Sequence, residues 1–161
     1  MASRKGRSRK VSRVRETPPA RSPSTTRYVE SSAVVAALME GDVAALEALR
    51  VPGEYVTSAL TIVECRRAVV RARSAGRISL SQERDALLSI DVFARRCAIV
   101  AIADTIVERA GRPFPLEPIR TLDSIHLATL DLLDSPRPDV TIVSRDVRVR
   151  DNARALGFIV E

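Results

Sequence analysis

The chain has 161 residues, of which 45% are hydrophobic and 29% are charged, and its formal net charge is +6. This length suits one globular domain, whose core must be aliphatic because aromatic residues make up only 3% and tryptophan is absent. Two cysteines without a CxxC spacing exclude a disulfide framework. No apolar run approaches the roughly 18 residues of a membrane span. We therefore expect a cytoplasmic protein with reduced thiols.

The positive charge is concentrated at the N-terminus. Residues 1–27 hold nine Lys or Arg and a single acid, Glu16, whereas the rest of the chain has 17 basic and 19 acidic residues. Residues 1–26 lack apolar periodicity and end in a Pro/Ser/Thr-rich linker, so we expect a disordered basic tail at 1–26 and a single folded domain at 27–161. The tail is either a solvated extension, a wrongly assigned start, or a source of sequence-independent RNA affinity.

After the tail, strand and helix patterns alternate. A short strand RYV precedes an apolar helix SSAVVAALMEG, a second helix DVAALEALRV ends at a Pro-Gly pair, and EYVTS predicts a strand. A long helix is expected to begin after Ser58 and to stop at Gly76, and the next helix to begin at Ser81. The segment CAIVAI is predicted to be a buried strand because it is short and wholly apolar.

The C-terminal half continues this alternation. ADTIVERAG predicts a short helix, RPFPLEPI a proline-broken loop, TLDSIHLATLDLL an apolar helix and DVTIVS a second buried strand. DVRVRDNARALG then predicts a helix closed by Gly157, and FIVE a final strand. Strands that alternate with helices pair in parallel, with helices on both faces of the sheet, so the sequence predicts an α/β fold.

Four carboxylates occupy positions that such a sheet would gather at one edge. Glu30 directly follows the first strand and Asp146 follows DVTIVS, while Asp123 lies in the first turn of its helix and Glu64 in the first half of the long helix. Sites in parallel sheets lie at the carboxyl ends of the strands. Clustered acids repel one another unless a cation joins them, and hard divalent metals prefer oxygen ligands. The pattern therefore predicts metal-assisted phosphodiester chemistry.

Residues near these acids allow two interpretations. His126 follows Asp123 by three positions and shares its side of the helix, and we favour a packed, hydrogen-bonded residue over a catalytic base. Asp151 is either a surface residue or an auxiliary ligand, and Cys65 is expected to be a small core residue. A basic strip on the long helix is either a solvated face or a surface for phosphate contacts; it consists of Arg66, Arg67, Arg71 and Arg73.

Four segments in order, YVESSAVVAAL, TSALTIVE, LDSIHLA and TIVSRDVRVRDNARALGFIV, resemble the PIN-domain ribonucleases, and within them the toxins of VapBC toxin–antitoxin pairs. The resemblance covers residues 27–161. It implies a three-layer α/β/α sandwich around a central, mostly parallel sheet of about five strands. It also implies a catalytic and metal-binding site with neighbouring hydroxyls at Ser32 and Ser144. The site acids would be Glu30, in place of the family's usual Asp, with Glu64, Asp123 and Asp146.

The same resemblance implies an endoribonuclease that uses Mg²⁺ or Mn²⁺ on an RNA substrate. It implies a small antitoxin protein as partner, together with a homodimer and a hetero-oligomer with that antitoxin. The alternative interpretation is a catalytically weak PIN-like RNA-binding module, which the glutamate at position 30 and the basic tail suggest. An unrelated nucleotide-binding or receiver domain ranks last, because GxGxxG and GxxxxGK[ST] are absent and no lysine follows Lys10.

Overall fold

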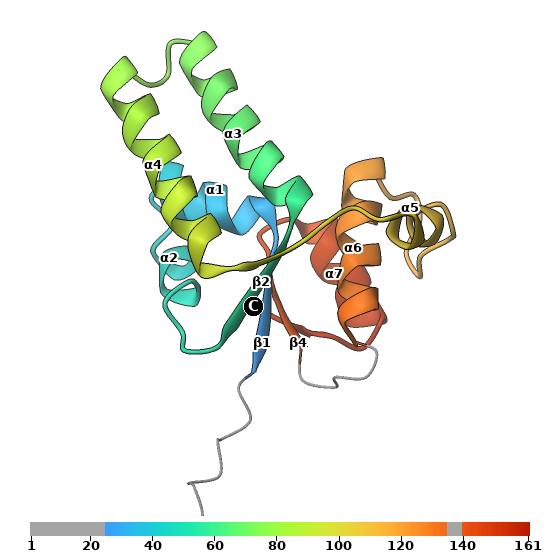
Figure 1. The fold of residues 1–161 in the computed structure, drawn as a ribbon. Helices are drawn as coiled ribbons and strands as arrows, with labels where there is room; N and C mark the ends of the chain where they lie inside the picture. The colour runs from blue at the N-terminus through green and yellow to red at the C-terminus, as the bar shows by residue number, and fades with distance from the viewer. Residues whose placement is uncertain (1–24, 135–139) are drawn as a thin grey trace, which may run out of the picture.

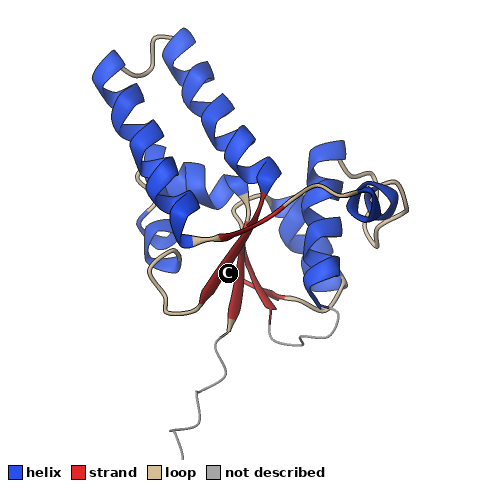
Figure 2. Cartoon of the chain, viewed as in Figure 1, coloured by secondary structure: helices blue, strands red, loops and turns tan. Residues whose placement is uncertain are grey.

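The computed structural model describes residues 25–134 and 140–161, in which strands and helices alternate (Figures 1 and 2). The strands are β1 (Thr26–Val29), β2 (Glu54–Ser58), β3 (Ala98–Val100), β4 (Val140–Val143) and β5 (Ile159–Val160). The helices are α1 (Ser31–Met39), α2 (Val43–Ala48), α3 (Ala59–Ser74), α4 (Leu80–Arg96), α5 (Asp104–Ala110), α6 (Thr121–Asp134) and α7 (Val147–Ala155). The tail expected at 1–26 lies, apart from its last two residues, outside this described part.

The described strands form one sheet in the order β3-β2-β1-β4-β5, and every pairing is parallel. Residues of β1 and β4 pair from Thr26 with Val140 to Val29 with Val143, so the two strands end side by side. From β1 the chain builds the sheet outward through β2 and β3, and then returns to the other side of β1 for β4 and β5. The carboxyl ends of β1 and β4 therefore form a topological switch point, where sheets of this kind bind ligands.

Helices cover both faces of the sheet, which gives the three layers visible in Figure 1. On the face covered by α1 to α4, Val29 and Val143 belong to a buried aliphatic cluster with Ile90. On the face covered by α5 to α7, Tyr28 and Ile142 belong to a second cluster. Because side chains alternate along a strand, consecutive residues of β1, and likewise of β4, point into the two clusters on opposite faces of the sheet. These features confirm the predicted α/β architecture.

Local features agree with the sequence in part. Ser58 caps α3 as predicted, since its hydroxyl accepts the backbone N–H of Leu60. However, α4 begins before Ser81, because Ser79 and Gln82 form a reciprocal capping box at its start. None of the helices in the described ranges is both long and apolar enough to cross a membrane.

The prediction of a buried strand at CAIVAI is wrong. The strand β3 lies at the edge of the sheet, and Ile99 is 48% exposed. An apolar run indicates a strand, but its burial depends on the order of the strands in the sheet, and apolar composition does not encode that order.

Candidate active site

Glu30 lies at the switch point, between the end of β1 and the start of α1. Its backbone N–H donates to the carbonyl of Val143 at 3.0 Å, which joins the ends of β1 and β4. Its side chain caps α1 by accepting the backbone N–H of Ser32 at 3.0 Å. Glutamate is not among the preferred N-cap residues, and here its longer side chain folds back to reach the first turn. The residue is only 4% exposed, so the carboxylate depends on protein donors.

Serine hydroxyls supply most of those donors. Ser31 Oγ donates to Oε1 of Glu30 at 2.6 Å, and Ser144 Oγ donates to Oε2 at 2.9 Å. Ser32 Oγ also donates to Oε2. Among the described residues, Oε2 thus accepts three hydrogen bonds and Oε1 accepts one. Because a carboxylate oxygen has two lone pairs, Oε1 is the atom that retains capacity for a further ligand.

The same hydroxyls connect Glu30 to Asp146. Ser32 Oγ accepts the backbone N–H groups of Arg145 at 2.8 Å and Asp146 at 3.0 Å. Ser144 Oγ accepts the Asp146 N–H at 3.1 Å. Asp146 then caps α7, because its Oδ1 accepts two backbone N–H groups from the first turn of that helix. Two serines therefore fix the relative positions of two of the predicted acids.

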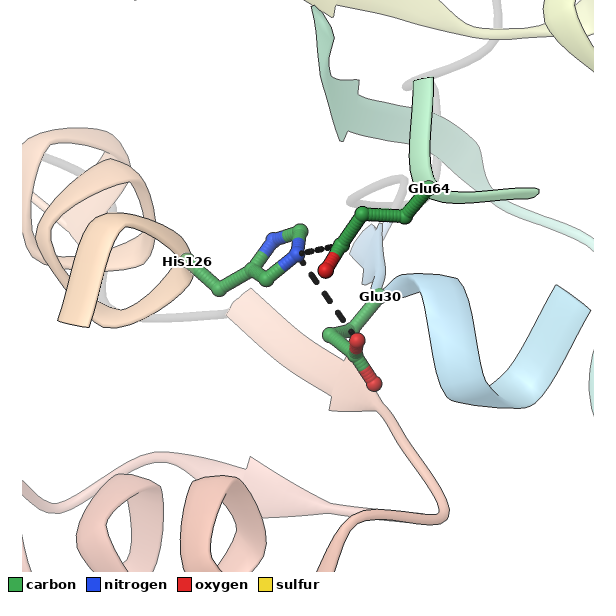
Figure 3. A group of neighbouring side chains, drawn as sticks. All are labelled: Glu30, Glu64 and His126. Carbon is green, nitrogen blue, oxygen red and sulfur yellow. Dashed lines mark hydrogen bonds and ion pairs between the residues drawn. The ribbon is translucent and has the colours of Figure 1, made fainter. Parts of the chain in front are cut away.

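Glu64 reaches the site from α3 and meets His126 of α6, as Figure 3 shows. His126 Nε2 lies 2.7 Å from Oε2 of Glu64 and 3.7 Å from Oε1 of Glu30. Its other ring nitrogen, Nδ1, lies 2.8 Å from the hydroxyl of Tyr28. One potential ligand atom from each of Glu30, Glu64 and His126 lies within 4.8 Å of the other two. The buried histidine therefore stands between two of the four predicted acids.

Electrostatic interactions keep Glu64 ionised and Tyr28 protonated. Burial raises the pKa of Glu64, but the hydrogen bond and charge of His126 outweigh it, with smaller contributions from Ser31 and Arg71, so its pKa is lowered. An ionised carboxylate only accepts hydrogen bonds, so His126 donates its Nε2 proton to Glu64. Burial, followed by the charge of the nearby Glu30, raises the pKa of the Tyr28 hydroxyl well above its usual value.

Asp123 lies in the first turn of α6, as predicted. Burial raises its pKa, and so do the charges of Asp146 and Glu30, against a lowering contribution from Arg120. Its Oδ2 atom is buried and has no hydrogen-bond partner among the described residues. An unpartnered carboxylate oxygen next to other acids is costly, and a bound cation would satisfy it.

A hollow of about 660 Å³ opens beside these acids. This volume lies in the range typical of small-ligand sites. The hollow exposes Glu64 and Asp146, and basic side chains share its wall. Its polar lining residues are Ser31, Ser32, Glu40, Glu64, Arg67, Arg71, Arg145 and Asp146.

The structure thus distinguishes among the residues proposed from sequence. Glu30 and Glu64 meet at His126, and Asp123 is coupled electrostatically to Asp146 and Glu30. His126 is packed and hydrogen-bonded, as favoured, but it is also part of the acidic cluster. Sequence reasoning left it out of the site, although its spacing of three from Asp123 was the available signal.

The remaining candidates lie outside the cluster. Asp151 has a half-exposed side chain that pairs with Arg154 at 2.9 Å, which agrees with the surface interpretation. Cys65 is 1% exposed and belongs to the core on the α1 side of the sheet, as predicted. Burial raises the pKa of the Cys65 thiol to about 12, so it is a poor nucleophile.

Comparison with known proteins identifies the family. The PIN domain matches residues 27–155 of this chain. Ribonuclease VapC46 of Mycobacterium tuberculosis (strain ATCC 25618 / H37Rv) is 36% identical over 141 residues, with 83% of this chain and 94% of that protein covered. Ribonuclease VapC35 of the same species (strain CDC 1551 / Oshkosh) is 31% identical over 106 residues, with 66% and 70% covered. The chain therefore belongs to the PIN-domain family and is VapC-like.

Solved structures share the fold. VapBC2 from Rickettsia felis, bound to a DNA fragment from their promoter, includes a chain with a TM-score of 0.58 and 16% identity, covering 84% of this chain and 97% of that one. A toxin–antitoxin complex from Klebsiella pneumoniae gives a TM-score of 0.57 at 19% identity, with 84% and 96% covered. At these identities the likeness establishes the fold alone, and it agrees with the three-layer architecture described above.

Proposed function

We propose that this chain is a divalent-metal-dependent endoribonuclease whose catalytic site consists of Glu30, Glu64, Asp123 and Asp146. The observation that carries this proposal is the convergence of these acids from separate elements on the switch point of a PIN-domain sheet. The relatives named as ribonucleases support the activity.

The donor set fits Mg²⁺ or Mn²⁺. Both ions prefer oxygen ligands, and the buried Oδ2 of Asp123 lacks any other partner among the described residues. Oε1 of Glu30, with Asp123 and Asp146, would hold the ion. When bound, such an ion lowers the pKa of a water and stabilises negative charge on a phosphate. Glu64, positioned by His126 through Oε2, would orient the attacking water.

The test is cleavage of a mixed cellular RNA pool by the full-length protein with Mg²⁺ or Mn²⁺. We expect cleavage that disappears in EDTA and in Asp123→Asn, while circular dichroism shows that the variant is folded. Cleavage that persists in EDTA, or in the variant, would contradict the proposed site.

A second candidate function is a catalytically weak RNA-binding module. The specific observation in its favour is that Glu30 Oε2 already accepts three hydrogen bonds, which hold the carboxylate between the start of α1 and the end of β4. The basic N-terminal segment offers phosphate contacts in this case. RNA binding without metal-dependent cleavage, and without Mn²⁺ binding in calorimetry, would favour this function over the first.

We also propose that the chain is the toxin of a toxin–antitoxin pair, that it binds a small antitoxin and that it forms a homodimer. Structural neighbours are chains of VapBC complexes, which supports this role. Expression should arrest growth for the wild type and not for Asp123→Asn. Co-expression with its antitoxin should restore growth and yield a stable complex on gel filtration. Normal growth, together with the absence of any small copurifying protein, would count against this role.

A further inference from the structure

The four arginines of α3 divide into two pairs with different surroundings. Arg66 lies 2.6 Å from the carboxylate of Asp91, and Arg73 lies 3.5 Å from the carboxylate of Glu83. Both acids belong to α4. This first pair therefore connects α3 and α4, the two long helices of the hairpin in Figure 1.

The second pair, Arg67 and Arg71, lines the 660 Å³ hollow together with Glu64. At about 100° per helical residue, the two arginines lie roughly 60° and 20° around the helix from Glu64, whereas the first pair lies on the opposite side. Both are exposed, and neither forms an ion pair within 4 Å with any described residue. Arg71 also lines an adjoining hollow of about 300 Å³, together with Arg77, which follows the end of α3.

We propose that Arg67 and Arg71 form a phosphate-binding subsite that holds the backbone of single-stranded RNA beside the acidic centre; this inference rests on the proposed ribonuclease function. The guanidinium group matches phosphate oxygens with two parallel N–H donors. Four residues of helix separate the two side chains by about 6 Å along the axis, so they can contact successive parts of one strand.

Such a subsite would offset the repulsion between the clustered carboxylates and an RNA phosphate. The clustered carboxylates repel an RNA phosphate, and nearby cations must offset that repulsion before the strand can approach. Arg145 also lines the hollow, but its Nε donates to Asp42 at 2.9 Å and is therefore committed within the protein.

Arg71 is not simply the counter-ion of Glu64. The hydrogen-bond partner of Glu64 is His126 at 2.7 Å, and no ion pair within 4 Å joins Arg71 to Glu64 in the described part of the chain. For Arg67 the structure gives no such partner among the described residues. Both guanidinium groups are therefore available to a ligand in the hollow.

The chain offers a matched control on the same helix. We would compare Arg67→Gln/Arg71→Gln with Arg66→Gln/Arg73→Gln, which remove the same charge and keep a good helix former. Binding of a fluorescein-labelled, unstructured RNA is measured by anisotropy over a range of NaCl concentrations, in EDTA so that no cleavage occurs. The full-length protein is used, and the basic N-terminal segment is identical in every variant.

We expect Arg67→Gln/Arg71→Gln to weaken RNA binding about tenfold or more at the lowest salt. The slope of log K against log[salt] should fall by about 1.4, since each single-strand phosphate contact contributes about 0.7. The control pair should retain the wild-type slope. Arg67→Lys/Arg71→Lys should restore the slope, because it restores the charge. Mn²⁺ affinity in calorimetry should not fall.

Equal slopes for the two double variants would overturn the subsite, as would a loss of Mn²⁺ affinity with an unchanged slope. Loss of a copurifying antitoxin, with RNA binding intact, would overturn it in favour of a protein contact. Because binding is measured without metal, an absence of metal-dependent cleavage by the wild type would count against the nuclease alone, and a reduced slope would still support the subsite.

Discussion

His126 Nε2 donates a 2.7 Å hydrogen bond to Glu64, and the chain of contacts continues through Nδ1 to the hydroxyl of Tyr28. Three elements are thereby joined across the molecule, β1, α6 and α3. Both His126 and Tyr28 are buried, so the bond between them is sealed from solvent, whereas Glu64 is partly exposed. This arrangement gives the chain's single histidine a role in orienting Glu64 rather than a place in the apolar core alone.

Two amide substitutions test whether His126 acts through its hydrogen bond to Glu64. His126→Gln retains a donor near the Nε2 position, whereas His126→Asn is too short to reach Glu64. We expect Gln to preserve more Mn²⁺ affinity and more RNA cleavage than Asn, by about tenfold or more, because displaced partners of metal ligands typically cost that much. Calorimetry and initial cleavage rates measure the difference. Equal losses in the two variants, at equal thermal stability, would show that His126 does not act through Glu64.

Ser32 is the second positioning residue, because one hydroxyl bonds Glu30 and two backbone N–H groups. Ser32→Ala leaves these buried groups with fewer partners, and we expect it to lower the free energy of unfolding by about 1–3 kcal/mol and to reduce cleavage. Ser74→Ala, at an exposed position of α3, is the control and should change stability by less than about 0.5 kcal/mol. Urea denaturation measures both. If Ser32→Ala leaves the free energy of unfolding unchanged, the hydroxyl network does not hold Glu30.

Asp123 should make the metal-free protein less stable as pH rises. Burial and the charge of Asp146 raise its pKa, so the native state holds this proton more tightly than the unfolded chain. The stability that this group contributes is present below the ordinary Asp pKa and is lost as pH rises through the raised value. In EDTA at pH 7, Asp123→Asn should therefore melt at a higher temperature than the wild type, and the difference should vanish near about pH 4. A variant that melts lower at pH 7 would contradict this.

Gly53 is required where β2 begins beside β1. A Cβ atom at this position would lie 2.7 Å from the carbonyl oxygen of Thr25 and 2.9 Å from a side-chain carbon of Arg27. We expect Gly53→Ala to lower the free energy of unfolding by about 1–3 kcal/mol while the folded fraction keeps its cleavage activity. Gly111→Ala is the matched control, because its Cβ would meet only ordinary contacts at 3.6 Å. Similar melting temperatures for the two variants would refute the close approach.

The sequence predicted the alternation of strands and helices because that signal is local. Apolar runs, periodicity and caps such as Ser58 involve residues a few positions apart, and the positions of Glu30 and Asp146 after strands followed directly from them. The start of α4 shows the limit of this signal, since two serines two residues apart both suit a cap and only one, Ser79, closes the capping box.

Only the tertiary structure decided how distant side chains meet. Strand order placed β3 at the edge, and the arrangement of α3 and α6 on opposite faces of one sheet brought His126 to Glu64 across 62 residues of sequence. The arginines of α3 look alike in the sequence, yet the α4 carboxylates engage Arg66 and Arg73 and leave Arg67 and Arg71 on the hollow. Local preferences fix each element, whereas contacts between elements depend on the relative placement of whole helices and strands, which no short stretch of sequence encodes.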